Sequence, residues 1–319
     1  GTRPESIELT LYRSVAGGAE ETVDAEAVWT KDGDVWTYVY SNLPMTDDEG
    51  NIYTYRVEES QPEAVNGEND TYQMTQNGYD LTNTLTGTTG LTGVKTWIDD
   101  GEDVRPDSIT LTLYRQAGAA GEKEAVAEAE PEWSKDGSEW TYVYEDLPKY
   151  DGNGVKYIYS VSEDVPSGYE LTEQNDTSLT NTQLTDVSVS KIWGTADGAQ
   201  IPEYVTVALY RAKDQDGGHM SPVLDGDGNQ ITMDLTADTG WQGTFRDLLK
   251  YDPDTGERYY YGIAEVYVSG GNGETGSLGD YIVRYNGDEA NGFVITNITP
   301  IEISGTKTWD DNSNQDGLR

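Results

Sequence analysis

Three lysines occupy strand positions that the pattern of apolar residues assigns to a protein core. Over residues 187–193, Lys191 shares one face with two valines and a tryptophan, because alternate residues of a strand point the same way. The same alternation gives Lys95 and Lys307 equivalent positions. One such lysine can reach solvent from a sheet edge, but three equivalent positions favour burial.

Three glutamates and three asparagines occupy similar inward positions. Each glutamate follows aromatic and β-branched residues at alternate positions, and each asparagine follows a leucine or isoleucine two positions earlier. The glutamates are Glu59, Glu163 and Glu265, and the asparagines are Asn83, Asn181 and Asn297. Isolated buried charges are costly, so we expect these groups to lie beside the lysines.

Two explanations account for a lysine, a glutamate and an asparagine buried together. The first is a static, hydrogen-bonded salt bridge. The second is chemical: burial lowers the pKa of a lysine and raises that of a glutamate, so a proton transfer can leave both neutral. A neutral amine is a nucleophile, and a protonated glutamate can polarise the asparagine carbonyl and shuttle protons. The expected product is a Lys–Asn isopeptide bond formed once, with loss of ammonia, so we expect no enzyme that turns over a substrate.

The strands that carry these residues recur at a spacing of about one hundred residues. The segment 3–13, Arg-Pro-Glu-Ser-Ile-Glu-Leu-Thr-Leu-Tyr-Arg, returns with few changes at 105–115 and more loosely at 201–211. Trp-Thr-Tyr-Val-Tyr at 36–40 returns at 140–144. Period-two alternation, punctuated by Asp-Gly and Asn-Gly turns, predicts an all-β fold of tandem β-sandwiches with short antiparallel strands.

The repeated motifs also predict the domain boundaries. We expect repeat one at 1–86, repeat two at 87–184, repeat three at 185–299, and the first strand of a following repeat, or a donor strand, at 300–319. Lys-x-Trp opens repeats two and three, and Thr-Asn closes all three repeats. Repeat one therefore has Glu59 and Asn83 without a lysine, whereas the last segment has Lys307 without partners.

Together these motifs resemble those of the Cna protein B-type repeat domains of Gram-positive surface adhesins and pilins. The shared features are Gly-x-Lys-x-Trp, Arg-Pro-x-x-Ile, Leu-Tyr-Arg, Tyr-x-Val-x-Glu and the final Thr-Asn. The resemblance spans essentially the whole chain and is looser in repeat three, where Ile201-Pro202 replaces Arg-Pro.

The resemblance implies reverse immunoglobulin-like sandwiches on the extracellular surface or cell wall of a Gram-positive bacterium, between a binding head and an anchor. It also implies Lys–Asn isopeptide bonds made with an acidic catalyst. By position, the catalyst is Glu163 for Lys95 and Asn181, and Glu265 for Lys191 and Asn297.

Composition excludes several other classes of function. The net charge of −39 opposes binding to nucleic acid or to an anionic membrane surface. The absence of cysteine excludes disulfides, and a single histidine, His219, leaves little scope for zinc or Ser-His chemistry. The segment 225–229 resembles the start of a calcium loop, but Thr236 stands where an EF-hand has a glutamate, so we predict a solvated turn. We expect no metal and no cofactor.

Two function hypotheses follow. In the first, the chain is a structural stalk or spacer of a cell-surface protein or fibre, and its partners are neighbouring repeats or copies of itself. In the second, it is an adhesive module that binds a host extracellular-matrix protein or glycan through the repeat-three insertions 212–229 and 269–279.

Two readings of repeat one also remain open. The chain is either a window on a longer array, or a unit that polymerises head to tail. In the second reading the strand with Lys307 enters repeat one of the next molecule, beside Glu59 and Asn83, and an isopeptide bond to Asn83 seals the joint.

Overall fold

The computed structural model describes residues 3–60, 70–195, 201–215, 218–269, 275–276 and 281–310. Strands account for the regular structure of these residues, apart from one 3₁₀ turn at Glu102–Val104. The predicted all-β fold is confirmed. The chain forms two compact units: unit 1 contains 1–95, 108–164 and 175–178, and unit 2 contains 96–107, 165–174 and 179–319. Repeat two thus contributes segments to both units.

In unit 1, repeat one forms three separate groups of paired strands. The strands are β1 (Leu9–Val15), β2 (Glu21–Val23), β3 (Val28–Asp32), β4 (Val35–Val39), β5 (Tyr53–Glu59), β6 (Thr71–Asn77) and β7 (Asp80–Thr86). β1 lies between β2 and β5, while β3 pairs only with β4 and β6 only with β7 in the part of the chain that the structure describes. Gly33 and Gly78 turn the two hairpins at positive φ angles of 54° and 64°, which glycine adopts without strain.

Repeat two supplies a similar set of strands to unit 1. They are β8 (Thr88–Ile98), β9 (Thr110–Ala117), β10 (Lys123–Ala125), β11 (Glu132–Asp136), β12 (Glu139–Pro148) and β13 (Tyr157–Asp164). β9 lies between β10 and β13, and β12 pairs with both β11 and β8. The hairpin register Trp133↔Tyr142 repeats the register Trp29↔Tyr38 of repeat one.

Unit 2 contains the end of repeat two and all of repeat three. Its strands are β14 (Tyr169–Gln174), β15 (Ser178–Gly194), β16 (Tyr204–Ala212), β17 (Ser221–Pro222), β18 (Thr232–Thr236), β19 (Gln242–Leu249), β20 (Tyr260–Ser269), β21 (Thr275–Gly276), β22 (Ile282–Asp288) and β23 (Gly292–Ile298). One sheet of repeat three has the order β19-β15-β23-β22. In the other sheet, β16 pairs with β20 along one edge and with β17 and β18 along the other.

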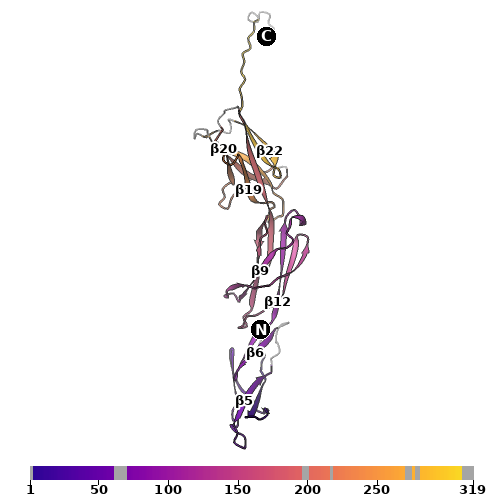
Figure 1. Cartoon of the computed structure of the whole chain (residues 1–319), viewed down its shortest axis with the longest axis vertical. Coiled ribbons are helices and arrows are strands. Elements are labelled where there is room, and N and C mark those ends of the chain that lie inside the picture. The colour runs from indigo at the N-terminus through magenta and orange to yellow at the C-terminus, as the bar shows by residue number, and fades with distance from the viewer. Residues whose placement is uncertain are drawn as a thin grey trace. The chain divides into compact units, whose positions relative to one another are not determined.

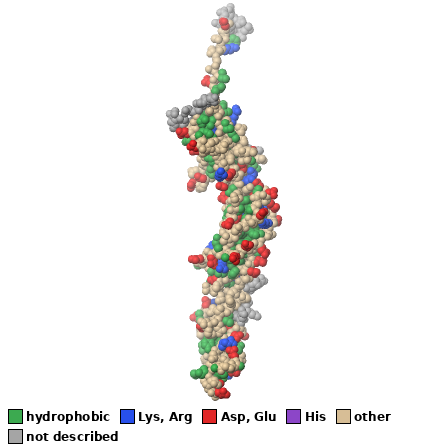
Figure 2. Space-filling model, viewed as in Figure 1, with side chains coloured by type: hydrophobic (Ala, Val, Ile, Leu, Met, Phe, Trp, Pro, Cys, Tyr) green, Lys and Arg blue, Asp and Glu red, His purple; other side chains and the backbone are tan. Residues whose placement is uncertain are grey.

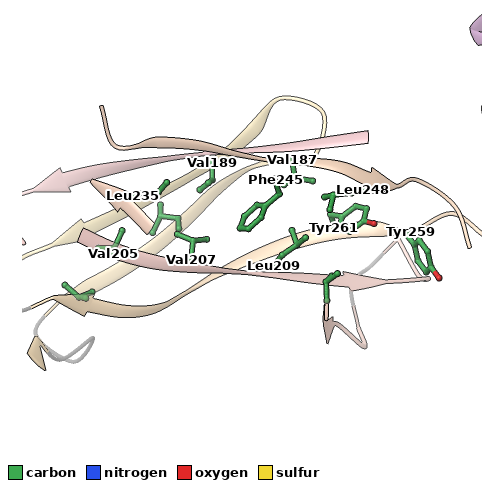
Figure 3. Close-up of a cluster of buried hydrophobic side chains, with 13 residues drawn as sticks. Val187, Val189, Val205, Val207, Leu209, Leu235, Phe245, Leu248, Tyr259 and Tyr261 are labelled. Atoms are coloured by element: carbon green, nitrogen blue, oxygen red, sulfur yellow. The ribbon is translucent and has the colours of Figure 1, made fainter. Parts of the chain in front are cut away.

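The core of repeat three lies between these two sheets (Figure 3). Val187 and Val189 of β15 face Val205, Val207 and Leu209 of β16, and Phe245 fills the space between them. Each of these side chains is almost completely buried. Their alternation along the strands is the period-two pattern expected of a sheet with one face in the core.

One pairing in repeat three departs from the antiparallel expectation. β15 and β23, the first and last strands of the repeat, pair in parallel with the register Lys191↔Ile295 and Trp193↔Asn297. The order of strands along the chain cannot reveal this pairing, because it joins segments about one hundred residues apart. Parallel neighbours run in the same direction, so the chain enters and leaves repeat three at opposite ends.

A Lys-Tyr pair forms a recurring contact that the sequence motifs did not reveal. In unit 1, the Lys149 amine lies 2.7 Å and the Tyr150 hydroxyl 3.0 Å from the carboxylate of Asp70, which is nearly buried. In unit 2, Lys250 and Tyr251 bind Asp100 in the same way. The Lys149 ammonium lowers the pKa of Asp70, so this carboxylate is charged at neutral pH.

Beyond β23, residues 301–310 are extended and form no strand with the residues that the structure describes (Figure 1). Ile301 and Ile303 are 84% and 87% exposed, although their alternation is that of a strand with one buried face. The Lys307 amine lies 4.0 Å from the ring centroid of Trp309. The alternation of apolar residues in this segment is therefore that of the opening strand of repeat three, and these side chains are exposed.

Acidic side chains are distributed over the face of the molecule that Figure 2 shows. Several form exposed ion pairs, such as Arg13 with Glu21 and Arg115 with Glu124. Exposed pairs of this kind contribute about 0–1 kcal/mol each, so they are consistent with a solvated surface and do not hold the fold together.

Candidate functional site: buried lysine, glutamate and asparagine

Repeat three brings the three groups together. The Lys191 amine of β15 lies 3.5 Å from Oε2 of Glu265 on β20, and both side chains are completely buried. Asn297 of β23 donates a hydrogen bond from Nδ2 to Oε1 of Glu265 at 2.6 Å, and it too is fully buried. The glutamate thus contacts the lysine with one oxygen and the asparagine with the other.

The strand registers explain this arrangement. Lys191 and Asn297 belong to adjacent parallel strands and are offset by two residues, and Glu265 projects from the opposite sheet, where it pairs with Val207. The Tyr285 hydroxyl accepts a hydrogen bond from the backbone N–H of Glu265 at 3.1 Å, which fixes the strand at this point. Sequence reasoning missed Tyr285, because β22 carries no motif shared with the other repeats.

Burial changes the chemistry of the lysine. Loss of solvent lowers the pKa of Lys191 to about 8, although the nearby Glu265 favours the charged form. An amine with this pKa is neutral for a substantial fraction of the time at physiological pH. The Lys191 amine also lies 4.1 Å from the ring centroid of Trp193, so an aromatic side chain covers it on one side.

Repeat two contains the equivalent charged pair. The Lys95 amine of β8 lies 2.9 Å from Oε2 of Glu163 on β13, and both side chains are completely buried. Burial lowers the pKa of Lys95 to about 8, with Glu163 opposing the shift. Asn181, on β15, is also fully buried, but it belongs to unit 2 whereas the charged pair belongs to unit 1.

Repeat one brings together the glutamate and the asparagine of the site. Asn83 of β7 donates from Nδ2 to Oε1 of Glu59 on β5 at 2.6 Å, the same bond as in repeat three. These two residues line a groove of about 800 Å³, together with Trp36, Tyr38 and Tyr40. We call it the acceptor groove. Lys307, the remaining residue of the sequence-based set, lies on the extended segment after repeat three and is exposed.

No cluster of histidine or acidic side chains suited to a metal ion is present among the described residues. In the same part of the chain, no helix is long and apolar enough to cross a membrane. The repeat-three insertion around 212–229 forms β17 and a turn, whereas much of the insertion 269–279 lies outside the described residues.

The fold and the site define a class: tandem immunoglobulin-like β-sandwich repeats, two of which bury a Lys–Glu pair between their sheets. A family model described as the Cna protein B-type domain matches residues 1–84, 91–182 and 187–298. The chain therefore belongs to the Cna protein B-type domain family.

The collagen adhesin of Staphylococcus aureus is 30% identical over 335 aligned residues, which cover 100% of this chain and 24% of that protein. The chain thus spans about a quarter of the length of this relative. Among solved structures, a single B repeat unit of the S. aureus collagen-binding surface protein has 24% identity and a TM-score of 0.28, covering 67% of this chain and 100% of that one. The major pilin subunit BcpA of Bacillus cereus has 14% identity and a TM-score of 0.27, covering 92% and 95%.

The lowered lysine pKa predicts a pH dependence of stability in a chain that cannot form the cross-link. In an Asn297→Ala variant, unfolded Lys191 keeps its proton up to its ordinary pKa of 10.5, whereas folded Lys191 loses it near pH 8. The unfolded state then binds more protons between these values, so the stability of repeat three should rise with pH in this window. Urea denaturation at pH 7 to 10 measures the effect.

Asn297→Ala/Lys191→Met is the matched control for this pH dependence. It has no titrating amine at this position, so the rise of up to about 1.4 kcal/mol per pH unit should be absent. If the free energy of unfolding changes with pH in the same way in both variants, folding does not lower the pKa of Lys191.

Proposed function

We propose that this chain is a stalk segment of a bacterial surface adhesin or pilin, reinforced by Lys95–Asn181 and Lys191–Asn297 isopeptide bonds. The observation that carries this proposal is the Lys191–Glu265–Asn297 site, in which one buried carboxyl contacts both the amine and the carboxamide. We further propose the repeat boundaries 1–86, 87–184 and 185–299, with 300–319 as the next opening strand.

The proposed reaction needs no external reagent. A proton passes from the Lys191 ammonium to Glu265, and the neutral Nζ attacks Cγ of Asn297. The Nζ–Cγ bond forms, the Cγ–Nδ2 bond breaks, and Nδ2 leaves as ammonia after it receives a proton. The products are a secondary amide and one ammonia molecule, so atoms and charge balance.

Glu265 is placed to serve both halves of this reaction. Its Oε2 faces the amine and its Oε1 faces the carboxamide. Once protonated, it can donate to Oδ1 of Asn297 after the amide turns about its Cβ–Cγ bond, which exchanges Nδ2 and Oδ1. Oδ1 is buried and accepts no hydrogen bond from the residues that the structure describes. A donor there would stabilise the oxyanion that forms on attack.

The position of the bond suits a stalk. β15 and β23 are the first and last strands of repeat three, and they are parallel neighbours. A force that pulls the two ends of the repeat apart shears this pair. A covalent bond between the two strands carries that force directly, so the sheets between them need not bear it.

Membership of the Cna protein B-type family supports an extracellular, cell-surface location, and the partners are then neighbouring repeats of the parent protein or other copies. We also propose that the Lys307 strand links chains head to tail through the acceptor groove. Repeat one has Glu59 and Asn83 in the same hydrogen-bonded geometry as repeat three, and no described residue of the chain presents a lysine there.

A glutamine variant tests the role of the acid. Glu265→Gln keeps the shape and a hydrogen-bonding group at this position but cannot take the lysine proton, so Lys191 and Asn297 should remain unlinked in a folded repeat. Peptide mapping after proteolysis measures the link. Glu203→Gln, an exposed substitution in the same repeat, should keep the bond. A Lys191–Asn297 linked peptide from the Glu265→Gln chain would remove Glu265 from the mechanism, and the same reasoning applies to Glu163 in repeat two.

A further inference from the structure

The acid of repeat three lies beside an irregularity in its strand pairing. β16 pairs with β20 without a shift as far as Val207↔Glu265, and the next pair is Thr206↔Tyr267. Val266 is therefore an extra residue on β20, which makes this point a β-bulge. Bulges bend the strand that carries them and change the direction of the side chains beside them. The direction of Glu265 thus depends on how the bulge is held.

The equivalent strand of repeat two has no bulge. β9 pairs with β13 in an unbroken register that includes Glu163 and ends at Asp164. In repeat three, β20 continues past Glu265 to Ser269, and the shift in register lets Val268 face the core, where it is almost completely buried. Of the two acids that contact a buried lysine, the one in repeat three is therefore the one beside a bulge.

The backbone N–H of Glu265 points away from β16. Leu209 of β16 donates its N–H to Ile231 and accepts a hydrogen bond from Val223, so its backbone groups face away from its partner Ile263 on β20. Such a pair exchanges no hydrogen bonds in an antiparallel ladder, and the N–H groups two residues further along each strand point the same way. The N–H groups of Ile263 and Glu265 therefore face the outer edge of β20.

A tyrosine from the opposite sheet binds this N–H. The hydroxyl of Tyr285, on β22, accepts a hydrogen bond from the Glu265 backbone N–H at 3.1 Å. Tyr285 also lines an open groove of about 410 Å³ beside the edge of β20, together with Ile263 and Phe293. Burial raises the pKa of the Tyr285 hydroxyl, although the Glu265 N–H opposes this, so the hydroxyl stays neutral at physiological pH. The bulged backbone thus has a fixed partner on an edge that borders a groove.

Glu265 must keep two contacts at once for the proposed reaction. Its Oε2 lies 3.5 Å from Nζ of Lys191, and its Oε1 lies 2.6 Å from Nδ2 of Asn297. A small rotation of the bulged backbone would move the carboxyl away from one of these partners. Reactions between positioned groups are sensitive to displacements of about 1 Å, so an anchor on the backbone of the acid affects the rate of the reaction.

From this we infer that Tyr285 is a positioning residue for isopeptide bond formation in repeat three: its hydroxyl holds the bulged backbone of Glu265, and with it the carboxyl, in contact with both reacting groups. The role is specific to repeat three, because Glu163 of repeat two lies in a regular register. This inference rests on the proposed function, in which the Nζ–Cγ bond forms, the Cγ–Nδ2 bond breaks and the nitrogen leaves as ammonia. Tyr285 acts through the backbone of the acid and transfers no proton.

Tyr285→Phe tests this role, because it removes the hydroxyl and keeps the ring. The 319-residue chain is made by cell-free translation, samples are denatured at intervals, and mass spectrometry of the proteolytic peptides measures both links. The Lys191–Asn297 link should form about tenfold more slowly in Tyr285→Phe, a change that one hydrogen bond can produce. The Lys95–Asn181 link in the same molecules should form at the parent rate, so repeat two is an internal control.

Tyr260→Phe is the matched control variant. Tyr260 belongs to the same strand but alternates with the buried Tyr261, so its side chain lies on the outer face of the sheet. Loss of this hydroxyl should leave the rates of both links unchanged.

Sucrose separates positioning from a purely structural role. It favours the folded state, so it would restore the rate in Tyr285→Phe if the hydroxyl only helped repeat three to fold. Positioning of the acid predicts that the repeat-three link forms slowly in sucrose as well.

The outcomes distinguish this inference from the proposed stalk chemistry. Equal rates for the repeat-three link in the parent and in Tyr285→Phe would overturn the inference and leave the proposed bonds standing. Restoration of the rate by sucrose, or an equal slowing of the repeat-two link, would also overturn it. A folded parent chain in which neither link appears would contradict the proposed function, and the inference with it.

Discussion

The folded 319-residue chain should weigh two ammonia molecules less than its sequence. Each complete repeat loses one, because Lys95 and Lys191 each displace the amide nitrogen of an asparagine. Glu163→Ala and Glu265→Ala should each restore one ammonia mass, and the double variant should restore both, since neither lysine then has a buried base to take its proton. Intact-mass spectrometry of the denatured monomer measures all four proteins.

Repeat one supplies the control for this experiment. Glu59 has the same contact to Asn83 that Glu265 has to Asn297, but no lysine is among the described residues that line its groove. Glu59→Ala should therefore leave the monomer mass deficit unchanged. A full sequence mass in a well-folded parent chain would show that the buried groups form static salt bridges instead.

Removal of the repeat-three bond should produce the largest change in stability. Closing a loop of about 100 residues between Lys191 and Asn297 restricts the unfolded chain by about 4–5 kcal/mol. Lys191→Met should remove this contribution and lower the melting temperature of repeat three by roughly 15–25 °C. Methionine keeps the buried position filled with an unbranched side chain, so the loss of packing should be small. Differential scanning calorimetry measures the change.

A double-mutant cycle isolates the cross-link from local effects. Lys191→Met and Asn297→Ala each abolish the same bond, so the double variant should lose little more stability than either single variant. Additive losses would indicate two independent local contributions and no bond between the two residues. Reduced and oxidised conditions should give the same result, because the chain contains no cysteine.

The period-two pattern predicted much of the molecule because it is a local property. Alternate side chains of a strand share a face whatever the strand pairs with, so the sequence alone indicates the all-β fold and the inward register of Lys191, Glu265 and Asn297. The repeated motifs add the number of repeats and show that each lysine has counterparts elsewhere. Since buried charges must be compensated, the same pattern also predicts that these groups lie together.

Tertiary structure decided what depends on contacts between distant segments. Three such contacts are the parallel pairing of β15 with β23, the approach of Glu265 to Lys191 and Asn297, and the contact of Tyr285 with Glu265. Each joins residues from different strands, and the sequence pattern of one strand does not indicate which other strand it pairs with. The sequence also could not show that Gly93 lies under the ring of Tyr142, where a Cβ atom would come within 2.2 Å of the ring, whereas repeat three has Val189 two residues before its lysine. Glycine and valine both suit a strand, and only the side chain that packs against them across the sheet determines which one fits.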